Sequence, residues 1–155
     1  MIGKVAVAVM AAFALPSPAT TAATFELDPD HSFVHFEVLH FGTSTTRGRF
    51  GPVRGTAELN VAQRQGAVRL RIDMNSINTG LAVFNSRLKQ DDLLATTAHP
   101  EAYYVAERFV FDGERLSEVR GEFTLRGQSQ PLALKAQRFS CRSNEQQQRV
   151  CGGDF

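Results

Sequence analysis

The sequence predicts an all-β domain built from an antiparallel sheet. Apolar and polar residues alternate with a period of two through most of the chain after residue 24, as in strands that bury one face and leave the other in water. Turn sequences at Gln65-Gly66, Asp112-Gly113 and Arg126-Gly127 separate the alternating runs, which indicates strands joined by hairpins. Such a sheet avoids exposed edges most completely by closing into a barrel, so we expect an antiparallel β-barrel.

Each alternating run predicts one strand. The first strand is expected within residues 28–42, and the others cover residues 53–61, 67–74, 103–111, 119–125 and 132–136. In the run that begins at residue 103, the pattern places Tyr103 and Val105 on the same face as Phe109. Residues 80–98 lose the alternation and carry apolar residues at helical spacing, which predicts one or two short helices that cover a mouth or face of the barrel.

The N-terminal segment, residues 1–23, has the layout of a secretory signal peptide. One basic residue, Lys4, precedes an apolar run and then a stretch of proline and small residues. The apolar run is shorter than the roughly 20 residues that span a bilayer. We therefore expect cleavage after Ala22 or Ala23, a mature domain of residues 24–155, and a periplasmic location.

The charge balance argues against a nucleic-acid partner. Without Lys4, the basic residues equal the 16 acidic residues in number, and the arginines are scattered among carboxylates. A nucleic-acid-binding protein normally gathers a basic excess on one face. No electrostatic partner is predicted.

The two cysteines, Cys141 and Cys151, predict a disulfide. An even, local pair in an exported protein is typical of a bridge, whereas the spacing differs from the C-x-x-C of redox and zinc sites. Closing so short a loop stabilises a fold by about 2 to 3 kcal/mol on the chain-entropy model. The polar residues 143–149 are expected to be the exposed loop that this bridge closes.

Strand geometry restricts what the histidines near the N-terminus can do. On one strand, His31 and His35 would point the same way but lie about 13 Å apart, at roughly 3.3 Å per residue, too far to share a metal ion. His40 continues the row of Phe36 and Val38. It is either a core histidine bonded to a backbone carbonyl or a polar contact that orients an apolar ligand.

No motif for catalysis is present in the sequence. A nucleophile elbow, a phosphate loop and an H-E-x-x-H pair are all absent, and the adjacent Asp91 and Asp92 are more typical of helix caps than of an acid/base dyad. We therefore predict no enzyme activity, metal or cofactor. The alternative is a metal-dependent or other enzyme that uses His31, His40, Asp91 and Asp92.

Several motifs together resemble the YceI family of exported bacterial proteins. They are D-x-x-H-S-x-V-x-F-x-V-x-H-x-G and G-R-F-G-x-x-x-G within residues 28–55, SINTG at 76–80, R-L-x-x-x-D-L-L-x-x-x-x-H-P at 87–100, and GEFTLRGQSQPLAL at 121–134. The resemblance covers residues 24–155. It implies a lipocalin-like barrel whose apolar pore holds a polyisoprenoid, such as an isoprenoid quinone or a polyprenyl phosphate, for binding or carriage in the periplasm.

The resemblance also suggests residues for the ligand site. Apolar side chains expected to form the wall are Phe33, Phe36, Val38, Phe41, Phe109 and Phe123. Many family members carry R-D-x-H-L in the helical segment, whereas this chain reads Phe84-Asn85-Ser86-Arg87-Leu88. The polar end of the ligand is therefore expected to meet Asn85 and Arg87, with His40 as a further contact, because a guanidinium is a permanently charged multiple donor.

Family members continue with further strands beyond the position of Phe155, so the resemblance implies a barrel that is incomplete at the C-terminus. The expected ligand is an isoprenoid lipid or quinone. A further alternative is a module that docks on a membrane electron-transfer protein and shares the lipid with it as a cofactor. We also expect a homodimer.

Overall fold

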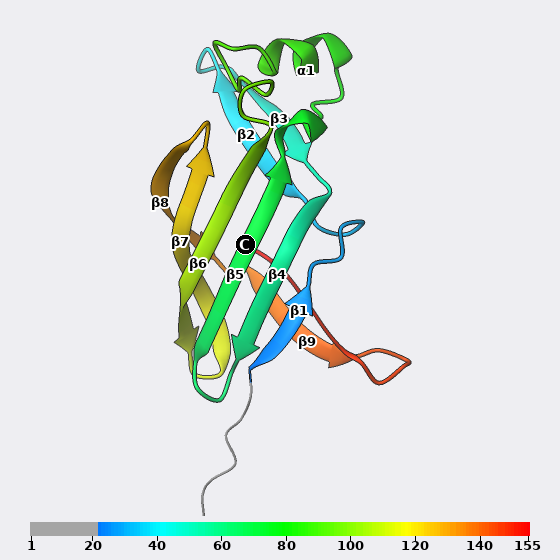
Figure 1. The fold of residues 1–155 in the computed structure, drawn as a ribbon, viewed down its shortest axis with the longest axis vertical. Coiled ribbons are helices and arrows are strands. Elements are labelled where there is room, and N and C mark those ends of the chain that lie inside the picture. The colour runs from blue at the N-terminus through cyan, green and yellow to red at the C-terminus, as the bar shows by residue number, and fades with distance from the viewer. Residues whose placement is uncertain (1–21) are drawn as a thin grey trace, which may run out of the picture.

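A computed structural model describes residues 22–155 of the chain. In this part the protein is mostly β, with antiparallel strands and little helix, which confirms the predicted fold class (Figure 1). The predicted signal peptide, residues 1–23, lies outside the described residues except for its last two positions.

Most consecutive elements are joined by short connections, and twelve residues separate α1 from β6. The strands are β1 (Ala23–Glu26), β2 (Val34–His40), β3 (Ser44–Phe50), β4 (Val53–Asn60), β5 (Gln65–Asp73), β6 (Glu101–Asp112), β7 (Arg115–Leu125), β8 (Gln128–Lys135), β9 (Arg138–Ser143) and β10 (Arg149–Asp154). A 3-10 helix, η1 (Met74–Ser76), and an α-helix, α1 (Ala82–Leu88), lie between β5 and β6. Among the described residues, no helix is long and apolar enough to cross a membrane.

Hydrogen bonding divides the strands into one main sheet and two hairpins. The main sheet has the order β1-β4-β5-β6-β7-β8, and β2–β3 and β9–β10 form separate two-stranded ladders. Every pair is antiparallel, and a bridge between Arg49 and Asn78 ties β3 to the segment after η1. Within residues 22–155, β1 and β8 are the two edges of the main sheet.

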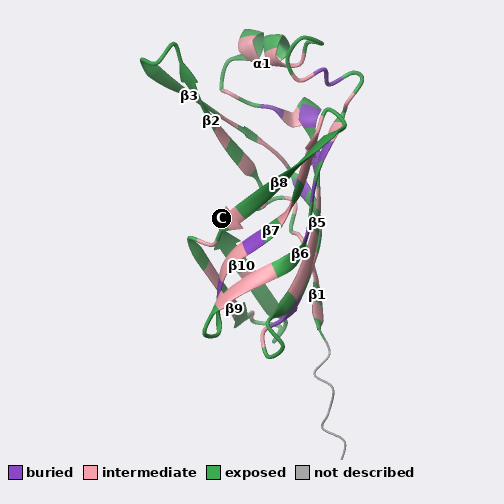
Figure 2. Cartoon of the chain, turned by 90° about the vertical axis from the view of Figure 1, so that its left-hand side faces the viewer, coloured by how far each residue is buried: buried purple, intermediate pink, exposed green. Residues whose placement is uncertain are grey.

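Both hairpins lie on the same side of the main sheet, which we call its inner face (Figure 2). Val34 and Phe50 of the β2–β3 hairpin pack against one group of buried residues, and Phe139 of β9 packs against another. The buried residues of the first cluster are Val53, Ile72, Met74 and Ala102, and those of the second are Tyr104, Ala106, Leu116 and Val119. Apolar burial on one face is what the alternating sequence predicts.

Strand β6 contains a β-bulge that changes which residues share a face. The register of β6 against β7 shifts after Ala106, and an extra residue at such a bulge reverses the alternation beyond it. Tyr104 therefore packs on the inner face with Phe109, while Tyr103 and Val105 are exposed on the opposite, outer face. The prediction that Tyr103 and Val105 share a face with Phe109 is wrong, because simple alternation does not reveal a bulge.

One predicted turn is misplaced by a few residues. The chain turns at residues 61–64, and the predicted Gln65-Gly66 turn is instead the start of β5. Gly66 lies on the strand, where a side chain would not fit because the ring of Phe109 occupies the place that a Cβ atom would need. The other two predicted turns, between β6 and β7 and between β7 and β8, are confirmed.

The disulfide between Cys141 and Cys151 is present, as predicted. The two cysteines face each other across β9 and β10, with 4.0 Å between their Cα atoms. The bridge therefore joins two paired strands, and the intervening exposed segment is shorter than predicted. The Oδ1 atom of Asn144 accepts hydrogen bonds from the backbone N–H groups of Gln146 and Gln148, which fixes the turn.

Candidate functional site

The inner face of the main sheet carries apolar side chains that are only half-buried. A fully packed core would bury them almost completely, so an apolar surface here remains open to solvent. Leu132 of the edge strand β8 is 38% exposed. The half-buried members packed beside the core clusters include Val68, Leu70, Phe109, Phe123 and Leu134. The inner face is therefore the strongest candidate for binding an apolar ligand.

Tyr104 fixes the strands that form this face. Its side chain is 2% exposed, and its hydroxyl donates to the carbonyl oxygens of Val119 at 2.9 Å and Leu132 at 3.2 Å. One side chain of β6 is thus bonded to both β7 and β8. Burial raises the pKa of Tyr104, so the phenol remains a neutral donor at physiological pH.

Three of the predicted wall residues lie on the inner face. Phe109 and Phe123 are half-buried beside the second core cluster. The ring of Phe36 lies 5.3 Å from the ring of Phe50 and covers Gly48, where a Cβ atom would collide with it. The structure therefore brings aromatic side chains from β2, β6 and β7 to the same side of the sheet.

The other three predicted wall residues lie elsewhere. Phe33 precedes β2, and its ring lies under the guanidinium of Arg49 at 4.5 Å. Val38 is exposed, and Phe41, at the tip of the β2–β3 hairpin, is 88% exposed. Because the tip projects away from the main sheet (Figure 2), the structure does not bring Val38 or Phe41 to the inner face.

His40 ends β2 and is exposed. Its ring contacts the ring of Phe41 with centroids 4.3 Å apart, so it is not the buried core histidine that the sequence left as one alternative. Within residues 22–155, no hydrogen bond joins His40 to Asn85 or Arg87. The three predicted polar contacts do not converge in this structure.

Asn85 and Arg87 are engaged in local structure around α1. The Oδ1 atom of Asn85 accepts hydrogen bonds from the backbone N–H and the hydroxyl of Thr79, at 2.9 and 2.7 Å. The guanidinium of Arg87 donates two hydrogen bonds to Asp92, at 2.7 and 2.6 Å. Their polar atoms therefore stabilise the helical segment, and a ligand would have to compete for the Arg87 donors.

Acidification is expected to release the pair of Arg87 and Asp92. Hydrogen bonds from Arg87 hold the pKa of Asp92 below its usual value, so the pair stabilises the folded state above the ordinary aspartate pKa and loses this effect as pH falls through the lowered value. An NMR titration should show a low midpoint for Asp92, and Arg87→Gln should raise it. An unchanged midpoint in Arg87→Gln would contradict the pairing; Arg142→Gln, on β9, serves as the control.

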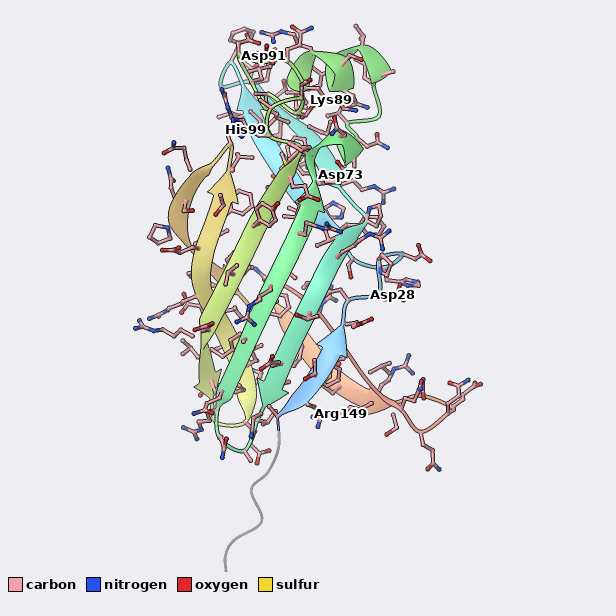
Figure 3. All side chains as sticks on the ribbon, viewed as in Figure 1. Asp28, Asp73, Lys89, Asp91, His99 and Arg149 are labelled. Atoms are coloured by element: carbon pink, nitrogen blue, oxygen red, sulfur yellow. A yellow bond between two sulfur atoms is a disulfide. The ribbon has the colours of Figure 1, made fainter. Side chains whose placement is uncertain are left out.

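The structure separates His31 of the predicted enzyme alternative from Asp91. His31 lies in a bend before β2 and not on the predicted strand, and its ring nitrogen Nδ1 lies 2.8 Å from a carboxylate oxygen of Asp28. Asp28 and Asp91 lie in different parts of the molecule (Figure 3). Among the described residues, no three His, Cys, Asp or Glu side chains form a group that could hold a metal ion.

Sequence reasoning missed several residues of the inner face. Val68, Leu70 and Leu132 follow the alternation and could have been chosen as wall residues from the pattern alone. Tyr104 was hidden by the bulge in β6. Phe139 lies on β9, in a segment without a clear alternating pattern, so no local signal indicated that it packs against this face.

Comparison with protein families gives a match over almost all of the described chain. The model of the YceI-like domain matches residues 25–153. The protein YceI of Shigella flexneri is 32% identical over 120 residues, which cover 74% of this chain and 61% of the relative. A UPF0312 protein of Shewanella denitrificans is 30% identical, over 81% of this chain and 67% of the relative. The chain spans about three fifths of the length of the Pseudomonas and Shigella relatives that it matches.

Solved structures show the same fold at low sequence identity. The Campylobacter jejuni YCEI protein superposes with a TM-score of 0.61 and 20% identity, over 79% of this chain and 72% of that one. Burkholderia cenocepacia BcnA gives a TM-score of 0.62 and 17% identity, over 78% and 73% of the two chains. On the extent of the family match, the chain belongs to the YceI-like domain family.

Proposed function

We propose that this protein binds and carries a long apolar lipid of the isoprenoid class against the inner face of its main sheet. The observation that carries the proposal is the row of half-buried apolar side chains on that face, with Leu132 at its open edge. Large exposed apolar surfaces on proteins mark binding sites. Membership of the YceI-like family and the motifs in the sequence support an isoprenoid chain as the ligand.

The energetics of such binding favour a long chain. Burying one methylene group is worth roughly 0.8 kcal/mol, so many weak contacts along the sheet add up without a strong polar anchor. The same contacts would remove the partly exposed side chains of the inner face from water. Binding and carriage need no chemical step, and the proposal includes none.

The proposed place of action is the periplasm. Residues 1–23 have the layout of a secretory signal peptide, and the bridge between Cys141 and Cys151 fits an oxidising compartment. Isoprenoid lipids reside in membranes, so a periplasmic carrier would move them through an aqueous space.

A pair of matched substitutions tests the proposal. Leu132 on the inner face and Val105 on the outer face are similarly exposed, at 38% and 43%. Leu132→Glu places a carboxylate against the proposed lipid, and burying an unpaired charge costs several kcal/mol. We expect Leu132→Glu to lower the lipid retained after native purification at least tenfold, whereas Val105→Glu retains as much as the unmodified protein.

The measurement is mass spectrometry of organic extracts, normalised to folded protein by circular dichroism. A reproducibly empty unmodified protein would refute the proposed function. Equal lipid content in Leu132→Glu and Val105→Glu would show that the lipid does not lie on the inner face.

A further inference from the structure

One end of the inner face opens into a hollow of about 370 Å³. It lies between the start of β7, the connection from β8 to β9, and β10. Its apolar lining is Leu116, Ala136 and Phe139, which also belong to or pack against the second core cluster. An apolar chain on the inner face could therefore reach this hollow without leaving apolar surface.

The hollow is also lined by a basic side chain that forms no hydrogen bond or ion pair within residues 22–155. Arg115 lines it, and among residues 22–155 the Arg115 guanidinium has no hydrogen-bond or ion-pair partner. Arg138, at the same hollow, is bound by Asp154, with 3.0 Å between Nε and Oδ2. Arg115 thus differs from both Arg138 and Arg87, whose donors are already occupied by carboxylates.

A neighbouring hollow extends the basic surroundings of Arg115. It measures about 390 Å³ and is lined by Arg115 and Lys135, with Glu118 as its acidic member. Glu118 is engaged by Arg120, whose Nε and Nη2 atoms donate to one carboxylate oxygen at 3.0 and 2.8 Å. Among the charged residues that line the two hollows, three are basic and one is acidic.

We propose that the hollow at Arg115 binds the anionic group of an amphiphilic ligand whose apolar chain lies along the inner face. A guanidinium presents paired donors that match the oxygens of a phosphate or carboxylate. The apolar side chains that line the hollow can contact the first carbons of the chain. This inference rests on the proposed function and adds the chemistry and position of the ligand's polar end. It places that end at Arg115 and not at Arg87.

Gly152 offers an independent way to test the hollow. It faces Ser140 across β9 and β10, and both residues line the hollow. A Cβ atom at Gly152 would meet no other atom within 4 Å, so a larger side chain fits without a backbone clash. Gly152→Leu should therefore fill part of the hollow while the hairpin and its disulfide stay intact.

The experiment compares two probes that differ only at the polar end. Geranylgeranyl phosphate and geranylgeraniol are titrated into delipidated full-length protein, and the dissociation constant of each is measured. A hydrogen bond to a charged group is worth enough to change affinity about tenfold or more. We expect Arg115→Gln to weaken the phosphate about tenfold and the alcohol less than about twofold, and Gly152→Leu to weaken the phosphate as well.

Arg142→Gln is the matched control, because Arg142 lies on β9 but does not line the hollow; it should bind both probes as the unmodified protein does. If Arg115→Gln lowers the affinity for both probes equally, or does not lower the affinity for the phosphate, then the inference is wrong and the proposed function still stands. Failure of the unmodified protein to bind either probe would instead refute the proposed function. If inorganic phosphate binds as tightly as geranylgeranyl phosphate, then the hollow is a site for free phosphate, and the inference that it binds an amphiphilic ligand is wrong.

Discussion

Replacing Tyr104 with alanine is expected to lower the free energy of unfolding by about 3 to 5 kcal/mol, the usual cost of removing a large buried aromatic side chain. Tyr104 is 2% exposed and packs with Ala106, Leu116 and Val119 in the second core cluster. The substitution removes this packing and leaves a cavity that the rigid sheet cannot close. It also removes the hydroxyl that bonds β6 to β7 and β8.

Two further variants separate these contributions. Tyr104→Phe keeps the packing and removes only the hydroxyl, so it should cost about 1 kcal/mol. Tyr103→Ala, one residue away on the outer face and 41% exposed, should cost clearly less than Tyr104→Ala. Urea unfolding followed by far-ultraviolet circular dichroism measures all three. Similar losses for Tyr103→Ala and Tyr104→Ala would contradict the assignment of faces on β6.

Replacing both Cys141 and Cys151 with serine is expected to lower stability by about 2 to 3 kcal/mol, because an open chain gains conformational entropy when it unfolds. The bridge joins directly opposed residues of β9 and β10. This hairpin brings Phe139 to the inner face, so its loosening should also increase amide exchange across residues 138–154.

Reduction provides the control for this prediction. A reducing agent should destabilise the unmodified protein by a similar amount and leave the double serine variant unchanged. Hydrogen exchange measured by mass spectrometry locates the effect. If exchange in β9 and β10 is the same with and without the bridge, then the strand pairing alone holds the hairpin, and the prediction is wrong.

The sequence predicted the main strands well because each buries only one face. Period-two alternation is a direct consequence of that burial, and β4, β5 and β8 follow it closely, as does β7 from Val119 onward. The bulge after Ala106 could not be predicted in this way, since an inserted residue changes the face without changing the composition. The pairing of β9 with β10 depends on contacts with other strands and on the disulfide more than on the local pattern of apolar and polar residues.

The candidate site was predicted less well than the fold. Phe36 and Phe123 reach the inner face through the regular alternation of their strands, whereas Phe109 reaches it only because of the bulge after Ala106. The polar contacts were chosen by residue type, and residue type does not show whether a donor is already occupied. Arg87 is bound by Asp92 five residues later, whereas Arg115 has no partner in the described chain.

The two adjacent tyrosines on β6 give the protein a built-in optical probe. The chain contains no tryptophan, and Tyr103 and Tyr104 are its only tyrosines, so they account for its intrinsic ultraviolet fluorescence. The hydroxyl of Tyr103 donates to Glu101 at 2.6 Å on the solvent side, while Tyr104 is enclosed on the inner face. Aqueous iodide should therefore quench only the Tyr103 emission, and the unquenched remainder should come from Tyr104 and follow the integrity of the second core cluster.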